Sequence, residues 1–198
     1  SAIKPQPQFA VQCAIAFGSV VMGRRWVTDR RNFSSLYLLN IGETGSGKEH
    51  TKTVLETMLE QAGLTDLIGP AGYTSGAGVM STLIKKPVHV AVVDELGRQL
   101  KAAAATGMQH KADALTAIME CFGRQDGTLR PQGYSTMTLK SAEAEKLEKF
   151  VRRPSLTLVG MSTPSEFMKA IGGGDVASGL LNRFLIVKSE IGVQLSQR

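Results

Sequence analysis

Residues 36–51 read LYLLNIGETGSGKEHT, in which an apolar run breaks into a glycine-rich turn and a lysine follows. Gly42, Gly47 and Lys48 fit the G-x-x-x-x-G-K phosphate-binding loop, with Gly45 as an extra glycine inside it. Glycines let the backbone curl around a polyphosphate with its N–H groups pointing inward. Lys48 adds a positive charge for the β- and γ-phosphates, and the N-terminus of the next helix faces the same anion. The stretch therefore favours a nucleotide-binding loop between a strand and a helix over a glycine-rich turn that binds nothing.

Glu49 stands where this loop usually has Ser or Thr. That hydroxyl is a Mg²⁺ ligand, so the Glu49 carboxylate is expected to coordinate the ion or to orient one of its waters instead. Thr51 and Thr53 are poor substitutes because they lie farther along the helix. The nucleotide is predicted to be held by the loop and the residues directly after it: Gly42, Glu43, Thr44, Gly45, Ser46, Gly47, Lys48, Glu49 and His50.

The composition is that of a globular chain with a basic balance. At 198 residues the simplest expectation is one domain, in which an N-terminal helix and lead-in (1–35) pack on a core (36–198). The net charge of +6 favours polyanionic partners. No apolar run approaches the ~20 residues of a membrane span, so no membrane partner is expected. Two distant cysteines, Cys13 and Cys121, are expected to be buried free thiols in a reducing, cytoplasmic setting. A start at Ser1 without an initiator Met suggests a fragment of a longer protein.

Apolar segments of strand type alternate with segments of helical periodicity. Strands are expected at 36–41, 88–93, 155–161 and 184–187, with a short one at 66–69 and hairpins within 26–39 and 127–140. Helices are expected at 9–22, 48–62, 79–84, 99–106, 111–122 and 164–171. This alternation predicts an α/β fold with a mainly parallel central sheet and helices on both faces.

Asp94 and Glu95 end the apolar run 88–93, about 45 residues beyond the loop. Both carboxylates would emerge at the carboxyl edge of the sheet, where ligands bind in open α/β folds. Asp94 is predicted to hold Mg²⁺ through water, and Glu95 to polarise the water that attacks the γ-phosphate. The simpler alternative is a strand end with two solvated acids.

Two later positions are candidates for catalysis. Ser162 and Thr163 end the strand 155–161 and can hydrogen-bond the attacking water or the γ-phosphate, although the pattern Ser162-Thr163-Pro164 equally indicates a helix N-cap. Arg183 precedes the last strand and can act as an arginine finger on a neighbouring subunit, with a surface salt bridge as the alternative.

The hairpin at 129–138 is the candidate DNA contact. Arg130 offers affinity for phosphate and Tyr134 a stacking face for a base. The alternative is an ordinary structural hairpin, which the generic mix of residues there favours. Arg124 can face the nucleotide or the next subunit, and the sequence leaves both open.

These signatures occur in the order of the additional-strand, catalytic-glutamate P-loop ATPases, the AAA+/RecA-like group. Within it, GRRW, SLYLLNIGETGSGKEHT, AVVDELG, LTLVGMSTP and GLLNRFL resemble the ATPase domain of phage and prophage primase–helicase replication proteins, over residues 22–189. The resemblance implies a three-layer P-loop NTPase fold, ATP and Mg²⁺ as ligands, a homo-oligomeric ring such as a hexamer, and translocation on single-stranded DNA. A loop ending in Lys-Glu is also similar to that of bacterial enhancer-binding activators, which are active ATPases, so Glu49 does not indicate a dead site.

We therefore expect an ATP-hydrolysing, helicase-like motor domain in phage or mobile-element DNA replication. The alternative is a nucleotide-dependent assembly or regulatory module, such as a loader or transcription remodeller, that does not unwind DNA. A small-molecule kinase is a third possibility, and the Asp94-Glu95 pair speaks weakly against it.

Overall fold

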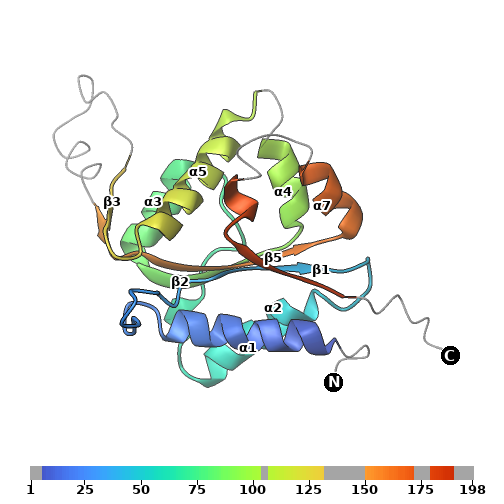
Figure 1. Ribbon diagram of the computed structural model, residues 1–198, viewed down its shortest axis with the longest axis horizontal. Coiled ribbons are helices and arrows are strands. Elements are labelled where there is room, and N and C mark those ends of the chain that lie inside the picture. Colours follow the sequence, from blue (N-terminus) through green and yellow to red (C-terminus); the bar gives the residue numbers. More distant parts are fainter. Residues whose placement is uncertain (1–5, 104–106, 132–149, 172–178, 190–198) are drawn as a thin grey trace.

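A parallel β-sheet forms the centre of the computed structural model, which describes residues 6–103, 107–131, 150–171 and 179–189 (Figure 1). Its strands follow the order β2-β5-β1-β6, and each neighbouring pair runs parallel. Their bounds are β1 (Tyr37–Ile41), β2 (Val88–Val93), β5 (Ser155–Ser162) and β6 (Phe184–Lys188). Since every strand runs the same way, all four carboxyl ends meet at one edge of the sheet.

Helices cover both faces of the sheet (Figure 1). One face carries α1 (Pro7–Val21) and α2 (His50–Gln61). The other carries α3 (Gly76–Lys85), α4 (Leu96–Ala103), α5 (Gln109–Gly123) and α7 (Pro164–Ile171). None of the helices in the described ranges is both long and apolar enough to cross a bilayer. The predicted α/β class, with a parallel sheet between helices, is confirmed.

Side-chain alternation along the strands divides the buried apolar residues between two cores. In β1, Tyr37 and Leu39 enter the core under α3, α4 and α5, whereas Leu38 enters the core under α1 and α2. Successive strand residues point to opposite faces, so a fully buried strand must be apolar on both. This explains why β1, β2 and β5 are nearly continuous apolar runs.

Two short predicted elements differ from the structure. The hairpin expected within 26–39 is reduced to one antiparallel bridge between Val27 and Phe33. In place of the strand at 66–69 there is a 3-10 helix, η1 (Thr65–Leu67), followed by a single parallel bridge between Ile68 and Val90. In both places the chain turns away after one pairing, so no ladder develops.

The hairpin predicted within 127–140 lies largely outside the described residues. Within them, strand β3 (Thr128–Leu129) pairs antiparallel with β4 (Val151–Arg152). Leu129 and Val151 are directly opposite and both buried, so this pairing supplies apolar burial as well as backbone hydrogen bonds. The remainder of the predicted hairpin, Tyr134 included, lies outside the described residues.

His89 is a fully buried polar side chain in β2. Its Nδ1 lies 2.7 Å from the Lys86 carbonyl oxygen, which can only accept, so Nδ1 carries the proton. Nε2 is then the acceptor for the Tyr73 hydroxyl at 2.5 Å. Burial lowers the pKa of His89 from 6.5 to about 4. The fold therefore holds His89 as a neutral imidazole that joins β2 to the loop before α3.

We expect the free energy of unfolding to fall in acid because of His89. The unfolded chain takes up a proton near pH 6.5, whereas the folded chain does so only near pH 4. Stability is therefore complete above pH 6.5 and declines as the pH falls toward 4, by about 3 kcal/mol from this group. Urea unfolding across this window should show a flatter pH dependence for His89→Gln than for the unmodified chain. Parallel curves for the two proteins would contradict this assignment.

Candidate functional site

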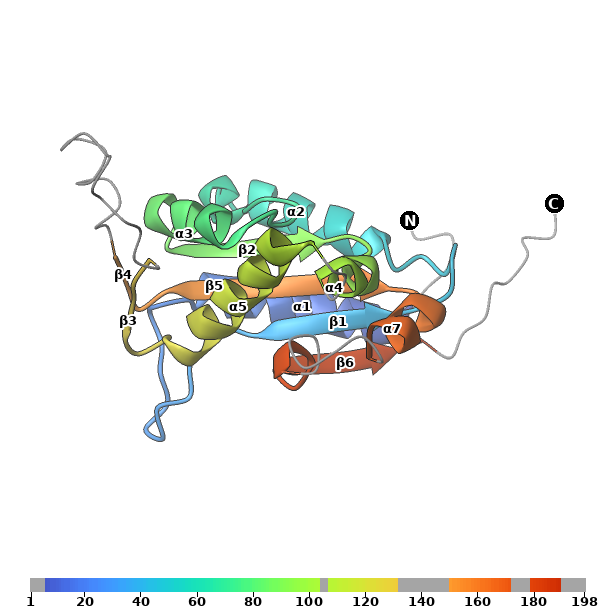
Figure 2. The ribbon, with the colours of Figure 1, turned by 90° about the horizontal axis from the view of Figure 1, so that it is seen from above.

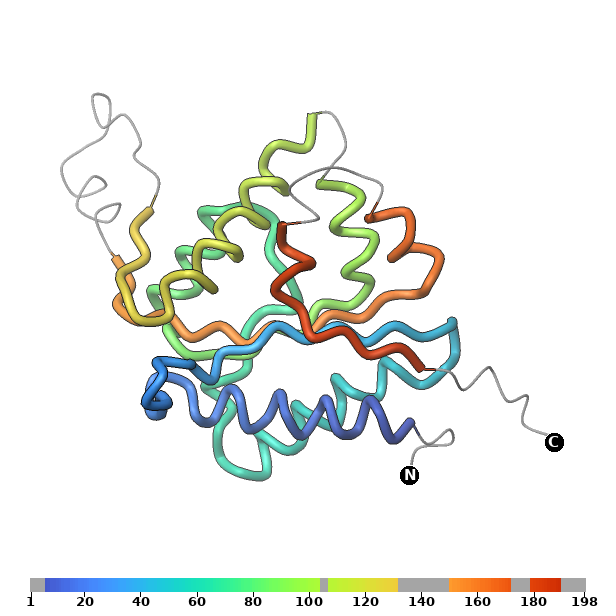
Figure 3. Tube along the Cα trace, viewed as in Figure 1, coloured from blue at the N-terminus to red at the C-terminus, as the bar shows by residue number. Residues whose placement is uncertain are grey.

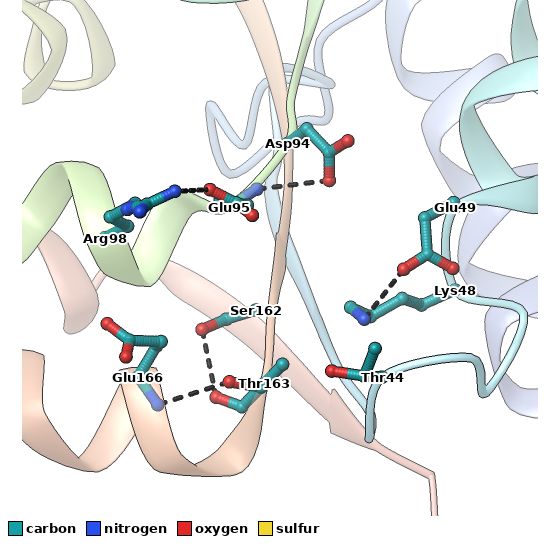
Figure 4. A pocket seen from close by; sticks show the side chains of 9 residues that line it. All are labelled: Thr44, Lys48, Glu49, Asp94, Glu95, Arg98, Ser162, Thr163 and Glu166. Carbon is teal, nitrogen blue, oxygen red and sulfur yellow. Dashed lines mark hydrogen bonds and ion pairs between the residues drawn. The ribbon is translucent and has the colours of Figure 1, made fainter. Parts of the chain in front are cut away.

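A pocket of about 420 Å³ opens at the carboxyl edge of the sheet (Figure 4). Its walls come from the loop after β1, the turn after β2 and the junction of β5 with α7. The lining residues are Thr44, Lys48, Glu49, Asp94, Glu95, Arg98, Ser162, Thr163 and Glu166. Seven of these nine were predicted as site residues from sequence, so the structure brings together side chains from three separate segments of the chain.

The glycine-rich loop has glycine at positions where its backbone favours it. Gly45 and Gly47 adopt φ values of 72° and 88°, in the left-handed region that favours glycine. The Ser46 amide donates to the Glu43 carbonyl at 3.0 Å, which closes a tight turn. At Gly42 a Cβ would lie 2.5 Å from Ser46 Oγ, so only glycine fits beneath this turn. The glycines are needed for the path of the chain itself.

Lys48 lies under this loop and is only 5% exposed. Its ammonium group contacts the Glu49 carboxylate at 2.8 Å and the Glu43 carbonyl at 3.4 Å. Partial burial raises the pKa of Glu49, but the hydrogen bond and charge of Lys48, together with a backbone hydrogen bond, outweigh it and the pKa is lowered. The buried Lys48 side chain therefore lines the pocket with the Glu49 carboxylate as its ion-pair partner.

Asp94 and Glu95 form the turn that joins β2 to α4. Glu95 has φ of 53°, unusual for a residue with a side chain, and such positions cost on the order of 1–3 kcal/mol. Its amide donates to the Asp94 carboxylate at 3.1 Å, and its own carboxylate accepts from Arg98 at 2.7 Å. This ion pair also raises the pKa of Arg98. The backbone here aims two adjacent carboxylates at one pocket.

Ser162 and Thr163 close the pocket at the end of β5. The Thr163 hydroxyl accepts from the Glu166 amide at 3.3 Å, which is the N-cap bond of α7. The Ser162 hydroxyl donates to the Thr163 carbonyl at 3.1 Å. The capping interpretation of Thr163 is therefore confirmed. Gly97 allows this junction to pack against α4, because a Cβ there would collide with Ser162 Oγ and the Glu166 backbone.

The charges in the pocket do not suit a polyphosphate by themselves. Four carboxylates (Glu49, Asp94, Glu95 and Glu166) face two cations (Lys48 and Arg98), which leaves two negative charges. Among the described residues, no three His, Cys, Asp or Glu side chains are grouped closely enough to hold a metal ion. Magnesium commonly uses one or two carboxylates together with phosphate oxygens and water. Asp94 and Glu49 fit that kind of shared site.

Several predicted residues do not line the pocket. His50 begins α2 with an exposed side chain. Arg183 comes just before β6, whose first residue is in register with the first residue of β1. It therefore lies at the amino edge of the sheet, about 17 Å from the loop at 3.3 Å per strand residue. Its guanidinium donates to the Gly179 carbonyl. Arg130, which directly follows β3, also lies away from the pocket.

Three residues near the site were missed from sequence. Arg98 and Glu166 line the pocket from the first turns of α4 and α7. Gln6 lies behind the loop, where its amide donates to the Ser46 carbonyl at 2.9 Å and its side-chain oxygen accepts from Ser189 at 2.5 Å. Arg98, three residues after Glu95, had a usable signal in its i,i+3 spacing from a carboxylate. Gln6 had none, because its partners are 40 and 183 residues away.

The sequence matches no protein-family model and no curated protein.

Proposed function

We propose that this chain binds and hydrolyses ATP with Mg²⁺ and serves as a helicase-like motor domain in phage or mobile-element DNA replication. The observation that carries the proposal is the buried Lys48 ammonium under a glycine-rich loop, in one pocket with Asp94 and Glu95. A glycine-rich turn can serve the path of the chain alone, and two acids at a strand end can simply be solvated. A phosphate-binding lysine and a catalytic carboxylate pair in a single pocket is the combination that ATP hydrolysis requires.

The order of the strands supports the same proposal. Strand β5 lies between β1, which leads into the glycine-rich loop, and β2, which ends in the carboxylates. A strand inserted at this place is the feature after which the additional-strand group of P-loop ATPases is named. The sheet is compatible with such a fold, and other α/β folds also have parallel sheets.

In the proposed complex the loop amides and Lys48 bind the β- and γ-phosphates. The pocket lining has two more carboxylates than cations, and a triphosphate would add further negative charge. A divalent cation is therefore needed to balance the negative charge. Asp94 would hold Mg²⁺ through water, and Glu49 would orient a second water or coordinate the ion directly. The ion supplies charge stabilisation at the transferring phosphoryl group.

Hydrolysis needs a base on the far side of the γ-phosphate. Glu95 is proposed to accept a proton from the attacking water. At the same time the water oxygen bonds to the γ-phosphorus, and the bond between that phosphorus and ADP breaks. Glu95 is paired with Arg98 at 2.7 Å, so this contact must loosen before the carboxylate can turn to water. The Ser162 and Thr163 hydroxyls are proposed to position the same water or the γ-phosphate.

Arg183 can serve only a neighbouring copy, because it lies at the opposite edge of the sheet from its own pocket. An exposed apolar strip beside it favours such assembly. Val11 and Ile15 lie one turn apart on α1, and Leu185 lies on the edge strand β6 in register with Leu38, on the α1 side of the sheet; all three are exposed. The Gln12 side chain joins the two elements by donating to the Leu185 carbonyl at 2.9 Å. We propose that this strip contacts the next subunit of a ring.

Steady-state ATPase measurements with and without single-stranded DNA test the proposal. We expect magnesium-dependent turnover that single-stranded DNA stimulates, and sedimentation of an oligomer when ATP is present. A folded oligomer that hydrolyses no ATP under either condition would overturn the motor function. Hydrolysis without DNA stimulation would favour the assembly or regulatory module instead, and an ATP-binding monomer would favour a kinase.

A further inference from the structure

The loop between α1 and β1 exposes a large aromatic side chain. Trp26 is 69% exposed, and it is the only tryptophan in the chain. Arg24, Arg25 and Arg30 surround it in sequence, and all three are exposed. Their guanidinium groups form no hydrogen bond or ion pair with any residue in the described ranges, and the pocket chemistry uses none of these side chains.

This loop is held in a defined shape. The Thr28 amide donates to the Asn32 carbonyl at 3.0 Å, and the Asn32 amide donates back to the Thr28 hydroxyl at 3.0 Å. At its start, Gly23 is buried where a Cβ would lie 2.6 Å from both Ser155 Oγ and a Val88 methyl. Ser19 fastens its end by donating to the Ser34 carbonyl at 2.6 Å. Trp26 is therefore presented by an anchored loop.

Two arginines occupy strained positions in this loop. Arg24 and Arg31 have φ values of 61° and 59°. Glycine or asparagine adopts this region more readily, so an arginine there costs on the order of 1 kcal/mol. The Arg31 guanidinium pairs with Asp126, which ties the loop to the turn before β3. Arg24 has no such partner among the described residues, and its cation points to solvent.

The loop belongs to a wider basic surface, which we call the arginine face. Figure 2 shows the loop and strands β3 and β4 at the same end of the molecule. Gln125 donates to the Ser35 carbonyl at 3.1 Å, and the Arg153 amide donates to the Gly127 carbonyl at 2.7 Å, so these segments are joined. The face is made of Arg24, Arg25, Arg30, Arg31, Arg124, Arg130, Arg152 and Arg153.

A second exposed aromatic lies within the arginine face. Phe150 is 47% exposed, and the guanidinium carbons of Arg130 and Arg152 lie 5.7 and 5.6 Å from its ring centroid. Cations at this distance over a ring are attracted to its π-face. The face thus combines guanidinium groups with two exposed aromatic rings.

The two edges of the sheet have opposite charge. Figure 3 shows the Trp26 loop at one end of the strands and the glycine-rich loop at the other. Basic pairs precede three of the strands: Arg30-Arg31 before β1, Lys85-Lys86 before β2 and Arg152-Arg153 before β5. The pocket edge has more carboxylates than cations. Among the described residues these basic pairs therefore lie away from the pocket, where a second polyanion can bind without competing for it.

We propose that the arginine face binds single-stranded nucleic acid, with Trp26 stacking on a base and the arginines contacting the backbone. A base must be unstacked to offer its face to an exposed indole ring, which favours a single strand over a duplex. Guanidinium groups suit phosphate oxygens because they form paired hydrogen bonds. This proposal rests on the proposed motor function in one respect, because a motor that moves on DNA needs a surface that binds it. The residues of the arginine face themselves are separate from the pocket.

The sole tryptophan makes the test direct. Oligo(dT) of about 20 nucleotides, longer than one contact site, should quench the fluorescence of Trp26 in a saturable way in the absence of ATP. With a labelled strand and fluorescence anisotropy, Trp26→Ala should weaken binding by about 5- to 150-fold, the range for loss of one stacked base. The double variant Arg24→Ala/Arg25→Ala should make the slope of log K against log salt shallower by about 1.4, the value for two phosphate contacts.

The matched control is Lys101→Ala/Lys188→Ala, which removes two exposed cations from other elements and should leave oligo(dT) binding unchanged. The proposal would be overturned if the unmodified chain did not bind oligo(dT). It would also be overturned if the Trp26 and arginine variants bound oligo(dT) as tightly as the unmodified chain does. Equal affinity for polyglutamate would overturn it in favour of an acidic protein partner. Lys48→Ala should retain oligo(dT) binding while losing ATP binding, so failure of the arginine face and failure of the ATPase proposal are separately visible.

Discussion

Lys48→Ala is expected to abolish ATP binding and to lower ATP turnover by at least about 100-fold, the loss seen when one preorganised charge-stabilising group is removed. Lys48 supplies the cation under the glycine-rich loop, and Arg98, the second cation of the pocket, is paired with Glu95. Without the ammonium group, Glu49 also loses its counter-ion and would repel a polyphosphate. Equilibrium binding of a fluorescent ATP analogue, together with steady-state ATPase rates, measures both effects.

The matched control for this variant is Lys52→Ala. Lys52 lies one turn farther along α2 and does not line the pocket, so its loss removes the same charge while leaving the loop intact. It should bind ATP as the unmodified chain does. In Lys48→Ala the Glu49 carboxylate loses its partner, but it is half exposed and can be hydrated. The variant should therefore still fold. If Lys48→Ala bound ATP with unchanged affinity, the loop would not be a phosphate site.

Glu95→Gln is expected to bind ATP normally and to lower the rate of hydrolysis by about 10²- to 10⁴-fold, the usual contribution of a general base. The amide keeps the size of the side chain and can still contact Arg98, but it cannot accept a proton from water. Single-turnover hydrolysis, compared with ATP binding on the same preparation, separates loss of chemistry from loss of affinity.

Glu166→Gln is the sharper comparison, because Glu166 is a second carboxylate in the same pocket. It is engaged by Lys169 at 3.2 Å and belongs to α7, a different element from the Asp94-Glu95 turn. We expect its loss to change turnover by less than about 10-fold, since it has no proton-transfer role. Equal losses for the two variants would show that the carboxylates act through the overall charge of the pocket, and Glu95 would then not be the base.

Much of this architecture is predictable because each element carries a local signal. The run 88–93 is β2 to the residue, and the periodic segment 111–122 lies within α5. The carboxyl ends of parallel strands share one edge of a sheet, and this rule alone predicts that Lys48, Asp94 and Ser162 lie close together. What made the pocket predictable was that its residues follow directly after strong strand signals.

The remainder depends on contacts between distant segments. The pairing of β3 with β4 joins two-residue strands separated by more than twenty residues, and neither has a periodicity of its own. Gln6 takes its role from Ser189, directly after β6, and Ser46 in the loop, which its neighbours in sequence do not reveal. The arginine face likewise appears only when loops from four regions of the chain are brought together, although its separate Arg pairs are visible in the sequence.

The Gln6 bridge has a consequence for how the molecule opens. Its amide and its oxygen link the glycine-rich loop to the end of β6, and Gln6 itself is the N-cap residue of α1. Because the Gln6 amide binds the Ser46 carbonyl, opening of the loop is coupled to the start of α1. The start of α1, the loop and Ser189 after β6 are therefore expected to open together. A ligand that holds the loop should also stabilise the start of α1.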